Sequence, residues 1–87
     1  MKFNIYEVNG RTKNLVEKNV SFGRVKERCI TLFKMYRKDN ISEGDVKSAK
    51  GWTSNMVYVR KLKLCDISKL QKIYIQNGEY FEECRKG

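Results

Sequence analysis

Apolar and polar positions alternate at the start of the chain, and this pattern predicts a β-strand. Phe3 and Ile5 fall on one face of KFNIYEV, as in a strand that buries one side. The dipeptide Asn9-Gly10 follows, which is typical of a two-residue hairpin turn. A return strand over residues 11–20 is the weaker prediction, and a loop is its alternative, because RTKNLVEKNV is polar.

The strongest periodic signal in the chain predicts an amphipathic helix over residues 22–38. Its apolar residues recur at spacings of three and four and form one stripe, at Phe22, Val25, Cys29, Leu32, Phe33 and Tyr36. Ser21 can cap the first turn by accepting a hydrogen bond from a backbone amide. Arg37 and Lys38 suit the negative end of the helix dipole.

A second, short helix is predicted over residues 42–50. Ser42 can cap it, and Glu43 and Asp45 place negative charge in its first turn, where the helix dipole favours it. Gly51 can take the left-handed conformation that often ends a helix.

Residues 53–64 fit two templates, and the functional prediction depends on the choice between them. A helix capped by Thr53 puts four apolar residues on one face, Trp52, Met56, Val59 and Leu62. A strand puts a different set on one face, Met56, Tyr58, Leu62 and Leu64. The β-branched and aromatic content favours the strand. The cap and the preceding glycine favour the helix, which we take as the prediction.

The C-terminal segment predicts a second β-hairpin, because residues 72–75 and 79–82 flank Gln76-Asn77-Gly78. The expected fold over residues 1–87 is therefore a single α+β domain. It has an N-terminal strand or hairpin, about three helices and a C-terminal β-hairpin. If residues 53–64 are a strand, the alternative is one main helix packed on a five-stranded antiparallel sheet.

Charge adds a functional constraint, because the 19 lysines and arginines outnumber the 10 acidic residues and give a net charge of +9. Most of the excess lies in residues 21–64, where the helices are predicted. A basic domain favours polyanionic partners such as nucleic acids. The alternative explanation is a generally lysine-rich composition without functional meaning.

Enzyme chemistry, metal binding and cofactor binding are not expected. The chain has no histidine, and its three cysteines, Cys29, Cys65 and Cys84, form no CxxC pair. It also has no P-loop or dinucleotide-binding glycine motif. The longest apolar runs are far shorter than the roughly 20 residues of a membrane-spanning helix. Unpaired cysteines fit a reducing compartment, so we expect a cytoplasmic or nucleoid-associated protein.

The order of elements resembles winged helix-turn-helix DNA-binding modules over residues 22–83. The residues that carry the resemblance surround the turn between the second and third helices, at Val46, Lys47, Gly51, Trp52 and Thr53. The segment VYVRKL follows as part of the recognition helix, and KIYIQNGEYF takes the place of the wing.

The resemblance implies that the third helix enters the DNA major groove. Side chains on its outward face would then contact base edges, namely Ser54, Asn55, Tyr58 and Lys61. Asparagine pairs with adenine and lysine with guanine in such contacts. Other basic residues would contact phosphates, namely Lys47, Lys50, Arg60 and Lys63. Lys72 and Asn77 are further candidates on the wing.

We therefore expect a small basic nucleic-acid-binding protein, either a DNA-reading regulator or a viral or phage accessory factor. Its partner would be double-stranded DNA, and a homodimer would suit a palindromic site. One alternative is a non-enzymatic inhibitor or adaptor that binds an acidic or nucleic-acid-associated protein. Another is stacking of single-stranded bases on aromatic residues beside basic ones, although such aromatics are more often core residues or cross-strand pairs. The candidates for stacking are Tyr6, Tyr36, Tyr58, Tyr74, Tyr80 and Phe81.

Overall fold

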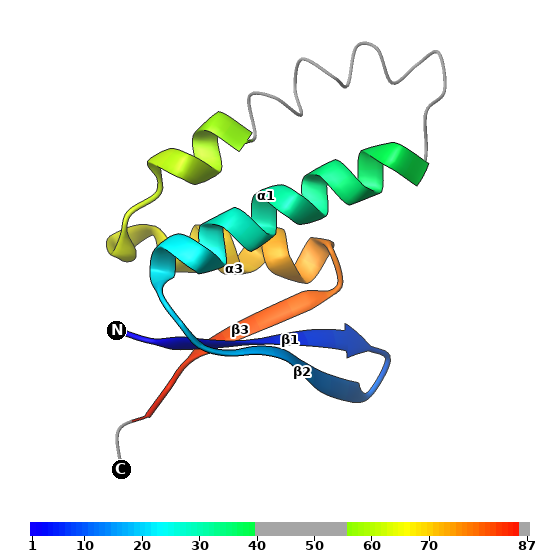
Figure 1. The fold of residues 1–87 in the computed structure, drawn as a ribbon, viewed down its shortest axis with the longest axis horizontal. Helices are drawn as coiled ribbons and strands as arrows, with labels where there is room; N and C mark the ends of the chain where they lie inside the picture. The colour runs from blue at the N-terminus through cyan, green and yellow to red at the C-terminus, as the bar shows by residue number, and fades with distance from the viewer. Residues whose placement is uncertain (40–55, 86–87) are drawn as a thin grey trace.

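The computed structural model describes residues 1–39 and 56–85, which form a three-stranded antiparallel sheet with helices on one of its faces (Figure 1). The elements in chain order are β1 (Phe3–Asn9), β2 (Thr12–Val20), α1 (Phe22–Asp39), a helical segment at residues 56–61, the 3₁₀ turn η1 (Leu64–Asp66), α3 (Ile67–Gln76) and β3 (Glu79–Glu83). The strand order is β2-β1-β3. The prediction of an α+β fold is confirmed.

The N-terminal hairpin is confirmed, with a detail that the sequence did not indicate. Asn9 pairs with Thr12, so the two turn residues are Gly10 and Arg11 instead of Asn9 and Gly10. Gly10 has a φ of +61°, as the first central residue of a type II′ turn requires. The return strand, for which a loop was the alternative, is therefore formed as β2.

A β-bulge divides β2 into two parts that face differently. Tyr6 pairs with Leu15, whereas its neighbour Ile5 pairs with Glu17, so Val16 is the extra residue. The bulge puts Leu15 and Glu17 on opposite faces of the sheet, although alternation alone would put them on the same face. Glu17 thereby reaches the side on which the helices lie.

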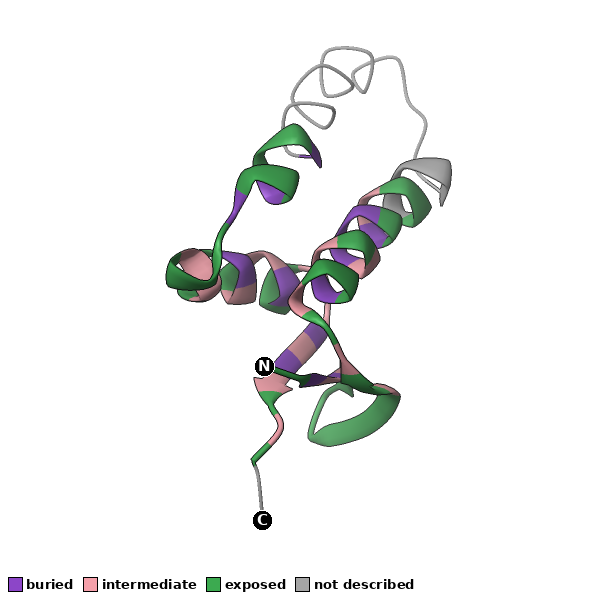
Figure 2. Ribbon diagram, turned by 60° about the vertical axis from the view of Figure 1, so that its left-hand side comes forward, coloured by how far each residue is buried: buried purple, intermediate pink, exposed green. Residues whose placement is uncertain are grey.

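The predicted first helix is confirmed as α1. The Ser21 hydroxyl accepts a hydrogen bond from the Arg24 amide at 3.2 Å, as expected of an N-cap. The buried side chains of α1 belong to one core together with those of the sheet and of α3, and Figure 2 marks the buried residues along the ribbon. The core residues are Phe3, Ile5, Val25, Cys29, Ile30, Leu32, Met56, Val59, Leu62, Leu70, Tyr74 and Phe81.

The helix predicted for residues 53–64 is confirmed over residues 56–61. Met56, Val59 and Leu62 are buried, whereas Val57 and Tyr58 are exposed, which is the predicted division of faces. The five-stranded alternative is not confirmed, because the segment it required as a strand is helical. The short helix at residues 42–50, Trp52 and the Thr53 cap lie outside the described residues.

The predicted C-terminal hairpin is wrong, and with it the wing of the resemblance. Residues 72–75 belong to α3, and β3 pairs with β1 instead of with a neighbouring strand. Leu70 and Tyr74 are buried four positions apart, so the helix is held by its packed face. Gly78 follows the last turn with a φ of +77° and its amide bonds the Ile75 carbonyl, so it ends a helix instead of turning a hairpin.

Candidate nucleic-acid interface

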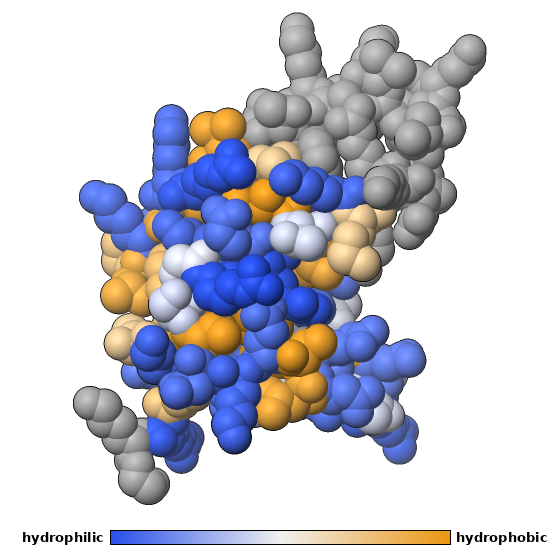
Figure 3. Space-filling model, in the orientation of Figure 1, coloured by the Kyte–Doolittle hydropathy of each residue, from blue (hydrophilic) through white to orange (hydrophobic). Residues whose placement is uncertain are grey.

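The 56–61 helix presents a mixed aromatic and basic surface, which we call the helix face and define as Val57, Tyr58, Lys61 and Lys63. Val57 and Tyr58 are each 45% exposed, and both lysines are exposed. The face exists because the opposite side of this helix is packed into the core through Val59. In Figure 3, the visible described surface is mostly hydrophilic, with apolar side chains in small groups between the charged ones.

The structure brings together some of the predicted contact residues and separates others. Tyr58, Arg60, Lys61 and Lys63 lie on or next to the 56–61 helix, as predicted. Asn77 follows the last turn of α3, at the end of that helix remote from η1, so it does not join them. Lys72 is exposed on α3 and not on a wing. The remaining four candidates lie outside the described residues, namely Lys47, Lys50, Ser54 and Asn55.

Lys26 of α1 holds the end of the 56–61 helix, a role that the sequence did not indicate. Its Nζ donates to the carbonyl oxygens of Arg60 at 3.1 Å and Leu62 at 3.0 Å, and lies 5.4 Å from the centre of the Phe22 ring. Carbonyls at a helix C-terminus lack partners within the helix, and a cation there also meets the negative end of the dipole. Lys26 therefore fixes the helix face relative to α1.

Replacing Lys26 with methionine keeps the apolar stem and removes both hydrogen bonds. We expect the amides of residues 59–63 to exchange with solvent faster, with their protection reduced by about 1–2 kcal/mol. Hydrogen exchange followed by mass spectrometry measures this. Lys34→Met is the matched control, because Lys34 is an exposed lysine on the same helix. Equal effects of the two substitutions would contradict the role of Lys26.

The charges around the helix face are predominantly positive. Residues 56–76 contain five basic residues and one acidic residue, Asp66. Asp66 accepts a hydrogen bond from the Lys63 amide at 3.0 Å and pairs with Lys69 at 3.7 Å. Arg60 pairs with Glu27 at 3.9 Å, but both side chains are more than half exposed, so this pair is weak. Lys61, Lys63 and Lys72 form no ion pair with the side chains of residues 1–35 and 56–85.

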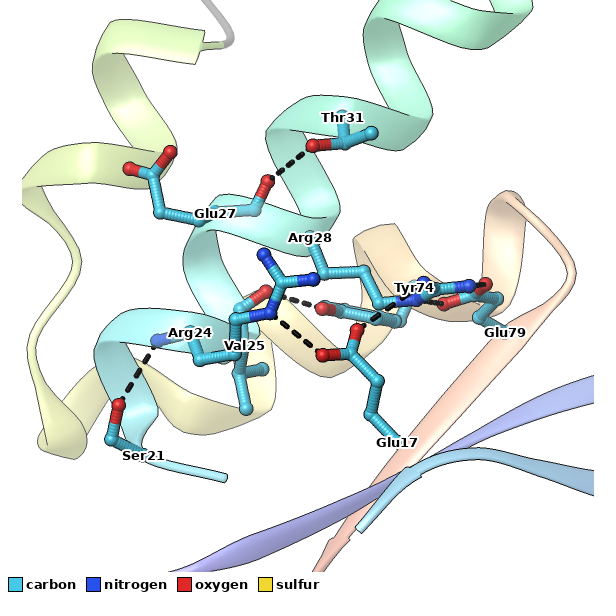
Figure 4. A network of polar contacts seen from close by, with 9 residues as sticks. All are labelled: Glu17, Ser21, Arg24, Val25, Glu27, Arg28, Thr31, Tyr74 and Glu79. Atoms are coloured by element: carbon cyan, nitrogen blue, oxygen red, sulfur yellow. Dashed lines mark hydrogen bonds and ion pairs between the residues drawn. The ribbon is translucent and has the colours of Figure 1, made fainter. Parts of the chain in front are cut away.

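A network of four charged residues connects α1 to the sheet (Figure 4). Arg28 bonds the nearly buried carboxylate of Glu79 through two nitrogens, at 2.6 and 3.1 Å, and reaches Glu17 at 3.2 Å. Arg24 bonds the other Glu17 oxygen at 2.7 Å. These carboxylates and guanidinium groups satisfy one another, so we assign the network to stability.

The pKa of Glu17 shows how this network depends on pH. Burial by itself raises the pKa of Glu17, but the hydrogen bonds and charges of Arg24 and Arg28 outweigh it and hold the pKa below its ordinary value. Because the folded-state pKa is the lower one, Glu17 stabilises the fold above its ordinary pKa. That contribution is lost as the pH falls through the folded-state pKa.

The three cysteines are free, and Cys29 is buried, whereas Cys65 is exposed and Cys84 lies between the two. Burial raises the pKa of Cys29 to about 12, so its thiol stays protonated at neutral pH. Within the described residues, no three acidic or cysteine side chains are grouped as metal ligands. None of the described helices is both long and apolar enough to cross a membrane.

Comparison with known proteins gives no information on function, so the function is inferred from the arrangement of these residues. No protein-family model, no curated protein and no solved structure matches this chain.

Proposed function

We propose that the chain is a small nucleic-acid-binding protein that contacts double-stranded DNA through the helix face. The observation that carries the proposal is the division of the 56–61 helix. Val59 is fully buried, whereas Tyr58 and Lys61 are exposed on a surface with an excess of positive charge. An α-helix fits the DNA major groove, and lysine and aromatic side chains can contact base edges and phosphates there.

The proposal retains only part of the resemblance to winged helix-turn-helix modules. A helix-turn-helix over residues 42–61 stays a prediction, with its third helix now supported over residues 56–61. The wing at residues 72–81 is dropped, because α3 occupies its first half. Asn55 and Lys61 stay the proposed base-contacting residues, and Lys63 and Arg60 the proposed phosphate contacts.

The exposed apolar side chains favour one rival function. Val57, Tyr58 and Leu64 are each about half exposed, at 45%, 45% and 47%, beside the basic residues. Aromatic residues are enriched in protein interfaces. The same helix face would therefore suit an acidic protein partner, as expected of an inhibitor or adaptor.

Replacing Lys61 with alanine is the direct test. We expect duplex DNA binding to weaken by roughly tenfold and the slope of log affinity against log salt to fall by about 0.9, because one cation is lost. Fluorescence anisotropy with a labelled 20-base-pair duplex across a salt series measures both quantities. Lys18→Ala is the matched control, since Lys18 is an exposed lysine on β2, away from the helix face.

The same series separates the two functions. Absence of salt-dependent binding to any duplex would end the DNA proposal. The rival predicts that an acidic protein partner binds the chain stoichiometrically and that Tyr58→Ala weakens this binding more than Lys61→Ala does.

A further inference from the structure

The outer face of the sheet carries two tyrosines that none of the described helices covers. Phe3, Ile5 and Phe81 belong to the core, so alternation along the strands puts Tyr6 and Tyr80 on the other side of the sheet. These two tyrosines are directly paired across β1 and β3, with ring centres 6.4 Å apart. The helices lie on the far side of the sheet in both ribbon views (Figure 2).

A cation from the third strand lies over both rings. Lys13 Nζ is 4.1 Å from the centre of the Tyr80 ring and 5.1 Å from that of Tyr6. Leu15, opposite Tyr6, is 51% exposed, and Val8, opposite Lys13, is 37% exposed. We call this set of residues, Tyr6, Val8, Lys13, Leu15 and Tyr80, the tyrosine face.

A groove of about 1030 Å³ extends from Tyr80 along the end of the sheet. Lys2 and Arg85 line it together with Asn19, Glu82 and Glu83. The Glu82 carboxylate accepts a hydrogen bond from the Tyr6 hydroxyl at 2.8 Å, so part of its charge is already satisfied. The groove thus places two cations, Lys2 and Arg85, next to the aromatic pair, together with the two carboxylates of Glu82 and Glu83.

We propose that the tyrosine face binds single-stranded nucleic acid by stacking bases on Tyr6 and Tyr80. Stacking requires flat aromatic surfaces at the solvent boundary, and backbone binding requires cations beside them. Both are present within one patch of five residues on three neighbouring strands, which gives room for two or three bases. A phosphate would bind Lys13 and draw its ammonium group off the rings, so the rings become available to bases.

This site is separate from the helix face and does not depend on the proposed duplex contact. The 56–61 helix lies on the same side of the sheet as α1 and α3 (Figure 1), whereas alternation puts the tyrosine face on the other side. Failure of the single-strand proposal can therefore be distinguished from failure of the duplex proposal, because each surface is tested with its own variants.

The experiment measures the anisotropy of labelled dT12 and rU12 with the wild-type chain and with Tyr6→Val/Tyr80→Val. Valine keeps the strand propensity and removes the ring. We expect the double variant to lose at least tenfold in affinity for one or both oligomers, because each stacked base contributes substantially. A preference between dT12 and rU12 identifies the sugar. Circular dichroism checks that the variant is folded.

Matched variants decide whether the rings are responsible. Tyr80→Phe should bind within twofold of wild type, since it keeps both rings and leaves the hydrogen bond from Tyr6 to Glu82 in place. Lys61→Ala should also bind single strands within twofold of wild type. The proposal is overturned if the valine variant binds as tightly as wild type, if the phenylalanine variant binds as weakly as the valine one, or if neither oligomer binds. Sedimentation showing that the tyrosine face holds two copies of the chain together would also overturn it.

Discussion

Replacing Glu79 with glutamine is expected to lower the free energy of unfolding by about 2–4 kcal/mol. Glu79 is 4% exposed, and two nitrogens of Arg28 bond its carboxylate. Glutamine carries no negative charge. The substitution therefore removes the charge that compensates the Arg28 guanidinium, in a site that is only partly open to water. Glu17 still contacts Arg28, which keeps the loss below that of a fully buried pair. Urea unfolding followed by circular dichroism measures the change.

Glu83→Gln is the control for this prediction, because Glu83 is an exposed carboxylate on the same strand. We expect it to change stability by less than about 0.5 kcal/mol. The double substitution Arg28→Met/Glu79→Leu should recover much of the loss, since it leaves no unpaired charge inside. If Glu79→Gln and Glu83→Gln have equal effects, the network does not stabilise the fold.

Replacing Phe81 with alanine is expected to lower the free energy of unfolding by about 3–5 kcal/mol. The Phe81 ring is 4% exposed and packs edge-on against Tyr74 at 4.9 Å and Phe3 at 5.8 Å. It therefore joins β3 to α3 and to β1 at one point. A protein of this length is stable by roughly 4–13 kcal/mol, so the loss brings it close to unfolding.

Thermal and urea unfolding measure the effect of Phe81→Ala, and two further variants define its cause. Ile75→Ala removes a large apolar side chain that is 61% exposed, and we expect it to change stability by less than about 1 kcal/mol. Phe81→Leu keeps most of the volume and should lose less than half as much as Phe81→Ala. A loss from Ile75→Ala as large as that from Phe81→Ala would show that our assignment of the core is wrong.

The sequence predicted the parts of the fold that local patterns determine. The stripe of α1 has six apolar positions at helical spacing, and Ser21 caps it as expected. The faces of the 56–61 helix also followed from the spacing of Met56, Val59 and Leu62. In each case the buried face repeats over enough residues for its period to be read.

The C-terminal half was mispredicted because the same dipeptide serves two purposes in this chain. Asn9-Gly10 leads into a hairpin turn, whereas Asn77-Gly78 ends a helix. The β-branched and aromatic residues before Asn77 favour a strand by composition. Packing of Leu70 and Tyr74 in the core outweighs that preference, and β3 finds its partner in β1, far away in the chain.

Residues of the candidate sites were predictable only where they lie on a periodic element. Tyr58 and Lys61 followed from the helical pattern, whereas the sequence raised stacking only as an alternative and did not single out Tyr6 and Tyr80 among six aromatic residues. The contacts of Lys26 join residues that are 34 and 36 positions apart, and no local pattern encodes them. The position of Glu17 depends on the bulge at Val16, which also has no clear sequence signal.

β1 lies between β2 and β3, and we expect these two strands to pair with it at very different times during folding. β2 follows β1 after a two-residue turn, and such hairpins close within microseconds, whereas Tyr6 and its β3 contact Glu82 are 76 positions apart. Until β3 docks, one edge of the central strand is open and can pair with another unfolded chain. Pairing between unfolded copies therefore competes with completion of the sheet. We expect the yield of native protein after dilution from denaturant to fall as the protein concentration rises.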